Sequence, residues 1–326
     1  MKALVTGGAG FIGSNLVDAL LDRGDDVDVV DDLSTGRRSN LDGAISRGAA
    51  FHEVDIRDGE RLRELVAGAR PDIVFHLAAQ IDVRKSIEDP AWDASINVLG
   101  TINVLEASRR AGVKRVINTS TGGAIYGEVD VMPTPEDVPP RPMAAYGQSK
   151  FCAEAYCGWV ERLYGLSCVT LRYGNVFGPR QDPRGEAGVI AIFCGRLLEG
   201  RRPLIFGDGR QTRDYTYVGD IVAANLAAAA HPEASGTYNA GTGVESSVLD
   251  VLEALRQAAG VPEGGFEPEF APARTGELQR SSLDVSRARA ELGFVAETSL
   301  LDGMRATLAW AREELPSVQD EAPEPA

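Results

Sequence analysis

The fold is decided by Thr6-Gly7-Gly8-Ala9-Gly10-Phe11-Ile12-Gly13, which follows an apolar run at residues 2–6 and leads into a helical pattern at 11–23. Glycines spaced in this way allow a tight turn, close approach of a pyrophosphate to the backbone, and close packing of a helix on a strand. The free N–H groups that open the helix offer that pyrophosphate a partial positive charge. The strand–turn–helix context therefore predicts a dinucleotide-binding loop.

An acidic residue at the end of the next predicted strand indicates which dinucleotide is bound. A carboxylate there, Asp31 followed by Asp32, can accept hydrogen bonds from the adenosine ribose and repels a 2′-phosphate. Arg37 and Arg38 are the counter-evidence, because arginines just beyond this strand can hold a 2′-phosphate. We expect NAD rather than NADP, with both arginines on a solvent-facing loop.

Apolar runs alternate with helical patterns through the first half of the chain, as in βαβ units. Strands are predicted at residues 2–6, 27–31, 50–54, 72–77, 115–119 and 167–173, and helices at 11–23, 60–67, 92–111 and 146–164. The predicted fold is α/β, a Rossmann-type doubly wound parallel sheet with a smaller α/β C-terminal substrate lobe.

The pattern loosens after residue 176, where Gly and Pro are frequent and the elements are shorter. We expect a dinucleotide-binding domain at 1–175, rejoined by about 220–240, and a smaller lobe at 176–315. The last segment, 316–326 (PSVQDEAPEPA), is acidic and Pro-rich, so a disordered tail is predicted there.

The composition narrows the choice of partners. The 326 residues include 33 Lys and Arg against 48 Asp and Glu, a net charge of −15, which argues against nucleic acid and against an anionic membrane surface. Four cysteines without metal-ligand spacing and three histidines argue against a metal site. The chain opens MKALVTGG, without a signal-peptide pattern, and has no run of the roughly 20 apolar residues that a membrane span requires. We expect a cytoplasmic protein that acts on a small molecule.

A candidate catalytic pair stands at Tyr146-Gly147-Gln148-Ser149-Lys150, which places a tyrosine and a lysine on one helix face. A free tyrosine has a pKa near ~10, and a neighbouring ammonium favours the phenolate. Tyr146 is thus predicted to act as a base near neutral pH. A surface pair is the ordinary alternative, which the Gly-rich loop elsewhere in the chain disfavours.

Taken together, these motifs resemble those of the extended short-chain dehydrogenase/reductase family, the NAD-dependent epimerases and dehydratases that modify nucleotide-sugars. The matching segments, in order, are TGGAGFIG at 6–13, Asp31, Asp55-Ile56, Leu77-Ala78-Ala79-Gln80, Asn97, Tyr146 with Lys150, and GNVFGPR at 174–180. The resemblance runs from residue 1 to about 312, and it is most similar to the members that are 4-epimerases of UDP-hexoses.

The resemblance implies a site for tightly bound NAD. It assigns the pyrophosphate to the amides of Phe11 and Ile12, the adenosine ribose to Asp31, and the nicotinamide ribose to Lys150. The full set of implied NAD-binding residues is Gly7, Gly10, Phe11, Ile12, Gly13, Asp31, Asp55, Ile56, Leu77, Ala78, Ala79, Gln80, Asn97, Tyr146 and Lys150.

One position departs from the family pattern. Members usually carry a catalytic Ser or Thr four residues before the tyrosine that is Tyr126 here, and this chain has Gly122. Either Thr121 or Ser120 supplies the hydrogen bond to the sugar hydroxyl, or Tyr146 works without it. We expect Thr121 to do so.

The same stretch selects the reaction within the family. Dehydratases carry an Asp-Glu pair at the positions of Gly123 and Ala124, and glycine and alanine cannot transfer the extra protons. The resemblance therefore implies redox at C4 alone. Tyr146 takes the proton of the 4-hydroxyl while C4 gives hydride to NAD, the 4-keto sugar turns over, and both return on the other face. The product is the C4 epimer of a UDP-hexose such as UDP-glucose or UDP-galactose.

The resemblance also implies the substrate-binding residues. The diphosphate would be held by Arg213 and Arg274, the uracil by the strand around Phe206, and the phosphate region by Asn175. Ser281 stands where a bulky tyrosine would exclude an N-acetyl group, so N-acetylhexosamines are expected to fit. The set is Thr121, Asn175, Val189, Leu204, Phe206, Arg213, Arg274 and Ser281.

Two other functions stay open at this point. A 4-keto reductase or dehydrogenase would use the same residues in one direction, and a non-catalytic NAD-binding regulatory protein would explain Gly122. The family also implies a homodimer, in which helices 92–111 and 146–164 pair with their copies.

Overall fold

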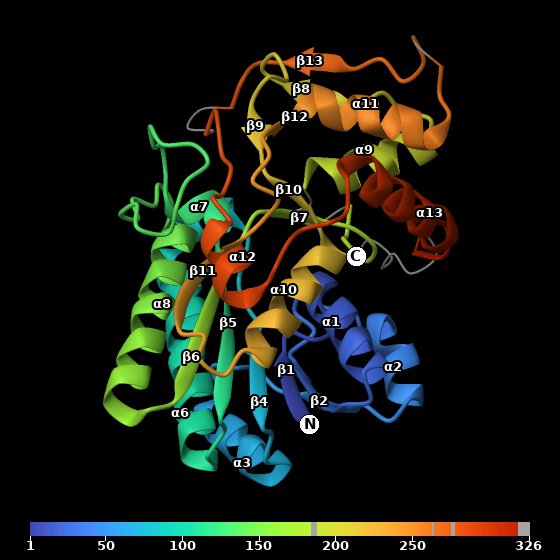
Figure 1. Cartoon of the computed structure of the whole chain (residues 1–326). Helices are drawn as coiled ribbons and strands as arrows, with labels where there is room; N and C mark the ends of the chain where they lie inside the picture. The colour runs from blue at the N-terminus through green and yellow to red at the C-terminus, as the bar shows by residue number, and fades with distance from the viewer. Residues whose placement is uncertain (184–187, 263, 275–277, 319–326) are drawn as a thin grey trace.

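A seven-stranded parallel sheet forms the centre of the computed structural model, which describes residues 1–183, 188–262, 264–274 and 278–318 (Figure 1). Its strand order is β11-β6-β5-β4-β1-β2-β3, with every neighbouring pair parallel. The strands are β1 (Lys2–Thr6), β2 (Asp26–Asp31), β3 (Ala50–Glu53), β4 (Ile73–His76), β5 (Arg115–Thr121), β6 (Ser167–Tyr173) and β11 (Gly236–Ala240). The order reverses between β1 and β4, so the predicted doubly wound Rossmann-type fold is confirmed, with its ligand crevice expected at their carboxyl ends.

Helices cover both faces of the sheet (Figure 1). One face carries α3 (Gly59–Ala69), α6 (Thr101–Ala111) and α8 (Ala145–Tyr164), and the other carries α1 (Phe11–Asp22), α2 (Asp42–Ser46), α10 (Val218–Ala230) and α12 (Ser286–Leu292). Each helix buries its apolar stripe, as Leu16 and Leu20 of α1 and Leu62 of α3 show with exposed fractions of 0%. Burial of such a side chain stabilises the fold by about 1.5–3 kcal/mol.

The helix predicted at 92–111 is interrupted. It consists of α5 (Pro90–Ala94), a π-helical turn at Ser95–Gly100 (η2), and α6. A further short helix, α4 (Val83–Glu88), precedes it and was not predicted; Asp82 caps it by accepting hydrogen bonds from two backbone N–H groups. The π turn could not be predicted from the sequence, because its apolar spacing barely differs from that of an α-helix. Such turns are frequent at functional sites.

A smaller lobe stands beyond the carboxyl ends of the central strands (Figure 1). Its core includes Phe193, Leu252 and Leu308. Its elements are α9 (Val189–Leu198), α11 (Val248–Ala259), α13 (Leu300–Val318) and the paired strands β8 (Leu204–Phe206) and β13 (Glu269–Ala271). Two further pairs, β7 (Asn175–Phe177) with β10 (Tyr215–Tyr217) and β9 (Thr212–Arg213) with β12 (Ser246–Ser247), complete the small sheets.

The chain passes between the large sheet and the small lobe more than once. Both α10 and β11 belong to the layer of the large sheet, and α12 packs on the same layer although the sequence placed it in the lobe. At the end of the chain, α13 runs through Val318, so its last residues overlap the tail expected at 316–326. Residues 319–326 lie outside the described part.

One buried carboxylate, which we call the Asp214 joint, connects its own segment of the chain to two others. Asp214, 1% exposed, lies between β9 and β10. Its Oδ1 accepts hydrogen bonds from the backbone and hydroxyl of Thr242, at 2.8 and 2.7 Å, and its Oδ2 accepts from the backbone N–H groups of Gly243 (3.0 Å) and Leu283 (3.2 Å). The small lobe is therefore fastened to the segment that follows β11 and to the segment around residue 283.

Candidate active site

The Gly-rich loop is packed so tightly that side chains are excluded from it. Gly7 has a φ of +71°, and a Cβ added there would lie 2.5 Å from the backbone nitrogen of Ala78, after β4. A Cβ at Gly13 would lie 2.1 Å from the carbonyl oxygen of Gly7. No side chain caps α1 at Gly10, so the first turn of the helix opens into the crevice with its N–H groups. This cradle suits a pyrophosphate.

Asp31 ends β2 and is 7% exposed. Its Oδ2 accepts a hydrogen bond from the backbone of Ala9 at 3.0 Å and its Oδ1 from Leu33 at 2.9 Å, so the carboxylate also fastens the Gly-rich loop. Burial raises the pKa of Asp31 despite these hydrogen bonds. A buried acceptor at this strand end is the group that an adenosine ribose requires.

The two arginines that could have favoured a 2′-phosphate are engaged elsewhere. Arg37 forms an ion pair with Asp182 at 2.7 Å. Arg38 stacks over the ring of Phe51 at 4.9 Å. Both guanidinium groups thus have partners within the chain, which agrees with the expectation of NAD.

The residues predicted for the adenine and nicotinamide regions follow the ends of β3 and β4. Ile56 is buried and lies so close to Gly100 in the π turn that a Cβ there would be 2.5 Å from Ile56 Cδ1. Asp55 is paired with Arg57 at 2.5 Å, and the hydrogen bond from that guanidinium lowers the pKa of Asp55. Three partly buried residues continue β4 into the crevice. They are Leu77, Ala78 and Ala79.

A buried hydrogen-bond network fixes Gln80 and Asn97. The backbone N–H of Gln80 donates to Asn97 Oδ1 at 3.0 Å, and Asn97 Nδ2 donates to the Gln80 carbonyl at 2.8 Å. Both side-chain amides also donate to Oδ1 of Asp93, at 2.8 and 3.0 Å. Sequence reasoning missed Asp93; its only signal was an acidic residue one helical turn before Asn97.

The predicted catalytic pair lies on α8, whose first turn is held when the backbone of Tyr146 donates to Ser86 Oγ of α4 at 3.0 Å. Tyr146 is partly buried and Lys150 is 2% exposed. Burial raises the pKa of Tyr146 to about 12, although its interaction with the Thr121 hydroxyl lowers it, and burial lowers the pKa of Lys150 to about 8. Burial therefore acts against the phenolate form, and the role of Tyr146 as a base near neutral pH stays a prediction.

The hydroxyl groups before α7 (Gly122–Ile125) differ in their surroundings. Thr121 caps α7, with its Oγ1 accepting from the backbone of Ala124 at 3.2 Å, and it also interacts with Tyr146. Ser120 is 3% exposed, and its Oγ has no hydrogen-bond partner within the described part of the chain. Thr121 is thus the hydroxyl that the structure brings to the tyrosine.

The two positions that separate epimerases from dehydratases lie in α7. A Cβ at Gly123 would lie 3.3 Å from Oδ1 of Asn175, which begins β7. An aspartate at this position would therefore crowd Asn175. Ala124 is partly buried. This turn carries no acid or base of its own, and it brings Asn175, predicted to contact substrate, next to the catalytic residues.

The remaining predicted substrate residues lie in the lobe. Arg274 stacks over the ring of Phe206, with 4.0 Å between the guanidinium carbon and the ring centroid. Arg213 lies in β9 beside the Asp214 joint, and Ser281 is 8% exposed next to the segment that packs under α7. Val189 starts α9 and Leu204 starts β8. Phe206 and Arg274 therefore contact each other, and neither of these two described residues forms a hydrogen bond with Tyr146.

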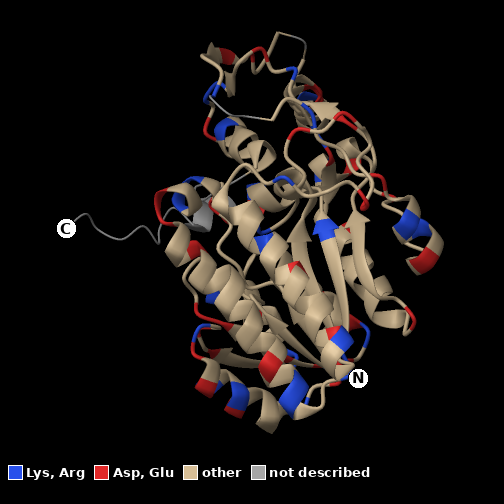
Figure 2. Cartoon of the chain, turned by 90° about the vertical axis from the view of Figure 1, so that its left-hand side faces the viewer, with Lys and Arg blue, Asp and Glu red and all other residues tan. Residues whose placement is uncertain are grey.

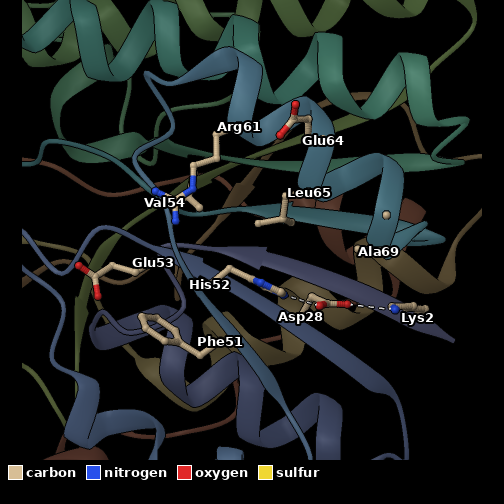
Figure 3. A pocket seen from close by; sticks show the side chains of 11 residues that line it. Lys2, Asp28, Phe51, His52, Glu53, Val54, Arg61, Glu64, Leu65 and Ala69 are labelled. Atoms are coloured by element: carbon tan, nitrogen blue, oxygen red, sulfur yellow. Dashed lines mark hydrogen bonds and ion pairs between the residues drawn. The ribbon is translucent and has the colours of Figure 1, made fainter.

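A separate hollow of about 720 Å³ lies at the outer edge of the sheet, beside β3 and α3 (Figure 3). Its buried Asp28 already accepts from His52 at 2.7 Å and pairs with Lys2 at 3.2 Å, as the dashed lines in Figure 3 show. None of the predicted site residues lines this hollow. We therefore place the site in the crevice above β1 and β4.

The described residues offer neither a metal site nor a membrane-spanning helix. No group of three or more His, Cys, Asp or Glu among them could hold a metal ion. No helix in the same part of the chain is long and apolar enough to cross a membrane.

Comparison with known proteins decides the family. Residues 3–241 match the model of the NAD dependent epimerase/dehydratase family. The chain belongs to this family. Among proteins similar to this family member, the UDP-glucose 4-epimerase of Mycolicibacterium smegmatis is 46% identical over 313 residues, which cover 96% of this chain and 99% of that protein.

Solved structures of other epimerases resemble this family member along its whole length. The UDP-glucose 4-epimerase of Thermotoga maritima, crystallised with UDP-glucose, has a TM-score of 0.91 and 45% identity, covering 97% of this chain and 100% of that one. The Thermus thermophilus UDP-glucose 4-epimerase, in complex with NAD, has a TM-score of 0.88 and 44% identity, covering 96% and 100%.

The residues of the crevice fit NAD, the cofactor of the family. Glycine is required at the loop where the pyrophosphate would lie, the helix end there is uncapped, and a buried carboxylate ends β2. When bound, NAD supplies the redox chemistry, accepting a hydride and returning it, and it carries a positive charge to the crevice.

Proposed function

We propose that this chain is a UDP-hexose 4-epimerase, interconverting UDP-glucose and UDP-galactose. The observation that carries this is the catalytic turn, where Thr121 and Tyr146 meet beside Lys150 while Gly123 and Ala124 add no further acid or base. Such a site can oxidise and reduce at C4 but cannot eliminate water. The full-length similarity to UDP-glucose 4-epimerases supports the same reaction.

In this mechanism the protein moves one proton. Tyr146 accepts the proton of the sugar 4-hydroxyl and later returns it to the oxygen of the 4-keto sugar. Thr121 donates a hydrogen bond that orients the same oxygen. Burial raises the pKa of Tyr146, and a lysine ammonium on the same helix face, at Lys150, is the group that would favour the phenolate. Tight burial of the site keeps water away from the reactive sugar.

The lobe would bind the nucleotide. Residues 1–175 with about 220–240 form the proposed NAD domain, on which α12 also packs, and the rest of 176–315 forms the proposed lobe. Arg274 lies on the face of Phe206 and is well placed to exchange that contact for the uridine diphosphate. Ser281, a small residue near the catalytic turn, is proposed to leave room for an N-acetyl group. A UDP-N-acetylglucosamine 4-epimerase from Methanobrevibacter ruminantium, 31% identical, shares the fold.

We also propose a homodimer that forms through α6, α8 and the π turn. Figure 2 turns this side of the molecule to the viewer and shows long helices with few charged residues along them. Tyr156, Trp159 and Leu163 repeat at helical spacing on α8 and are 38–57% exposed. Trp92 and Leu99 add exposed apolar surface beside them. Pairing with a second copy would bury these exposed apolar side chains.

The four cysteines are free, which supports the proposed cytoplasmic location, since reduced thiols persist there. Of the alternatives, a regulatory NAD-binding protein has less support. A Cβ at Gly122 would lie 2.5 Å from both methyl carbons of Leu283, which gives the glycine a packing reason, and the chain carries both Tyr146 and Lys150. A one-way 4-keto reductase would have to release its oxidised dinucleotide and bind a reduced one after each turnover. Incubation without added cofactor tests this requirement.

The decisive experiment incubates the purified protein with UDP-galactose, without added cofactor, and separates the nucleotide-sugars. We expect conversion toward UDP-glucose by resident NAD, and then turnover of UDP-N-acetylglucosamine. A Tyr146→Phe variant prepared in parallel is the control for a contaminating epimerase. Absence of conversion, even with NAD supplied, would overturn the proposal, and strict dependence on NADPH would favour the reductase.

A further inference from the structure

Asp93 is a buried carboxylate that the reaction does not account for. It is 0% exposed on α5, and its Oδ1 accepts hydrogen bonds from Gln80 and Asn97. Its Oδ2 is also enclosed and has no hydrogen-bond partner among the described residues. Two neutral amides do not neutralise the charge, and a buried carboxylate without a counterion is costly. The position therefore calls for a cation.

A buried cationic group, Lys150, stands on the neighbouring helix. It is 2% exposed on α8, the helix that packs on α5, and its Nζ forms no ion pair within the described part of the chain. Glu154, one turn along α8, is already engaged by Arg172, whose Nη2 and Nε lie 2.7 and 2.9 Å from the carboxylate. Asp93 thus remains as the carboxylate near Lys150 that has no cationic partner.

We propose that Asp93 is the buried counterion of Lys150 and a positioning residue for the Tyr146–Lys150 pair. Through one water molecule that bridges its free Oδ2 to the ammonium, Asp93 keeps Lys150 charged and in place. The π turn fixes the other oxygen through Asn97, so the carboxylate is held rigidly. The assignment deepens the proposed function and rests on it.

The charges around the pair support this assignment. Burial lowers the pKa of Lys150, and Asp93 is one of the groups that oppose this effect, with Cys157 and Glu154 of α8. His76 of β4 also faces Lys150 but is neutral, because burial lowers its pKa to about 3. The charge of Asp93 acts on Tyr146 as well and raises its pKa. Removing that charge should therefore move the titrations of Lys150 and Tyr146 in the same direction.

The first test is Asp93→Asn, which keeps the shape and the Oδ1 acceptor. Since the pKa values of Tyr146 and Lys150 both fall, we expect the acid and alkaline limbs of the kcat/KM profile to move to lower pH by about one unit. The near-ultraviolet phenolate absorbance of Tyr146, isolated by subtracting the Asp93→Asn/Tyr146→Phe variant, should shift equally. Asp89→Asn removes an equal charge from the exposed cap of the same helix and should leave both readouts unchanged. Coincidence of the Asp93→Asn and wild-type profiles would overturn the proposal.

The second test needs no activity. In Lys150→Met the buried charge of Asp93 loses its counterion, and this costs stability wherever an Asp side chain ionises, above about pH 3.9. Stability is then lost as pH rises above that value, and we expect the urea midpoint of Lys150→Met to fall between pH 4 and 7, while the Asp93→Asn/Lys150→Met double variant does not show this fall. Additive effects of the two substitutions would refute the pairing. If the wild type fails to epimerise any UDP-hexose, this cycle still decides the role of Asp93.

Discussion

Leu283 occupies the space that a side chain at residue 122 would need. A Cβ built on Gly122 would lie 2.5 Å from both methyl carbons of Leu283. Leu283 is 1% exposed, and its backbone donates to Asp214 Oδ2, while the neighbouring residues pair with Thr134. The glycine that stands where relatives carry a hydroxyl is therefore required by packing, and it is no sign of lost catalysis.

Gly122→Ser should accordingly destabilise the protein. The Cβ cannot be accommodated beside a fixed leucine, so we expect a loss of about 1–3 kcal/mol in the free energy of unfolding, measured by urea denaturation. In a Leu283→Ala background the same substitution should cost much less. Equal costs in the two backgrounds would show that Leu283 is not the obstacle.

Thr121 and Ser120 offer a matched pair for testing the sugar-binding hydroxyl. Thr121→Val should lower kcat on UDP-galactose about 10²-fold with little change in KM, because a donor to the reacting oxygen is lost. Ser120→Ala removes a hydroxyl that has no hydrogen-bond partner among the described residues and should retain near wild-type kcat. The opposite ranking would assign the role to Ser120.

His76 should make stability depend on pH. Burial lowers its pKa to about 3, below the unfolded value near ~6.5, so the unfolded chain binds the extra proton between these values. Its contribution is fully present above about pH 6.5 and is lost as pH falls, at up to about 1.4 kcal/mol per unit. We expect the unfolding free energy of the wild type to fall more steeply from pH 6.5 to 5 than that of His76→Asn. Parallel curves would contradict this.

Asp31→Asn should weaken the preference for NAD. The substitution removes the charge that repels a 2′-phosphate, so the ratio of NADP to NAD affinities, measured by calorimetry, should rise about tenfold. One of the two backbone donors, from Ala9 or Leu33, also loses its acceptor, which should cost about 1–3 kcal/mol of stability. Arg37→Ala serves as the control and should leave NAD affinity unchanged, since Arg37 pairs with Asp182.

Trp159→Glu should separate the proposed dimer. The ring is 43% exposed and packs edge-on against Tyr156 and Tyr164 on the apolar face of α8. A charge there cannot be buried against a second copy without a partner. Sedimentation should show a dimer for the wild type and a monomer for the variant. Val244→Glu, at an exposed apolar residue outside this face, should remain dimeric; a monomeric wild type would contradict the interface.

The sheet and the Gly-rich loop were predictable because their signals are local. Apolar runs separated by helical periods define βαβ units, and the loop at residues 6–13 lies on one continuous stretch. The position of Tyr146 and Lys150 on one helix could be predicted for the same reason. These features require only neighbours along the chain.

What the sequence could not predict depends on contacts between distant segments. The packing of Leu283 against Gly122 joins residues far apart in the chain, and no local pattern announces it. The raised pKa of Tyr146 comes from burial, which only the folded structure defines. The role proposed for Asp93 depends on a π turn that has almost the spacing of an ordinary helix.

The Asp214 joint has a consequence for motion within the molecule. A hinge between two domains requires a few connecting residues that can change conformation. Here the carboxylate of Asp214 binds two other segments, at residues 242–243 and at Leu283, at the border between the sheet and the lobe. Large rocking of the lobe over the sheet would have to break these hydrogen bonds together. A 4-epimerase must nevertheless present both faces of its keto sugar to one hydride position. Because these hydrogen bonds oppose such rocking, we expect the rotation to fall to the substrate, whose keto sugar would turn about the diphosphate link.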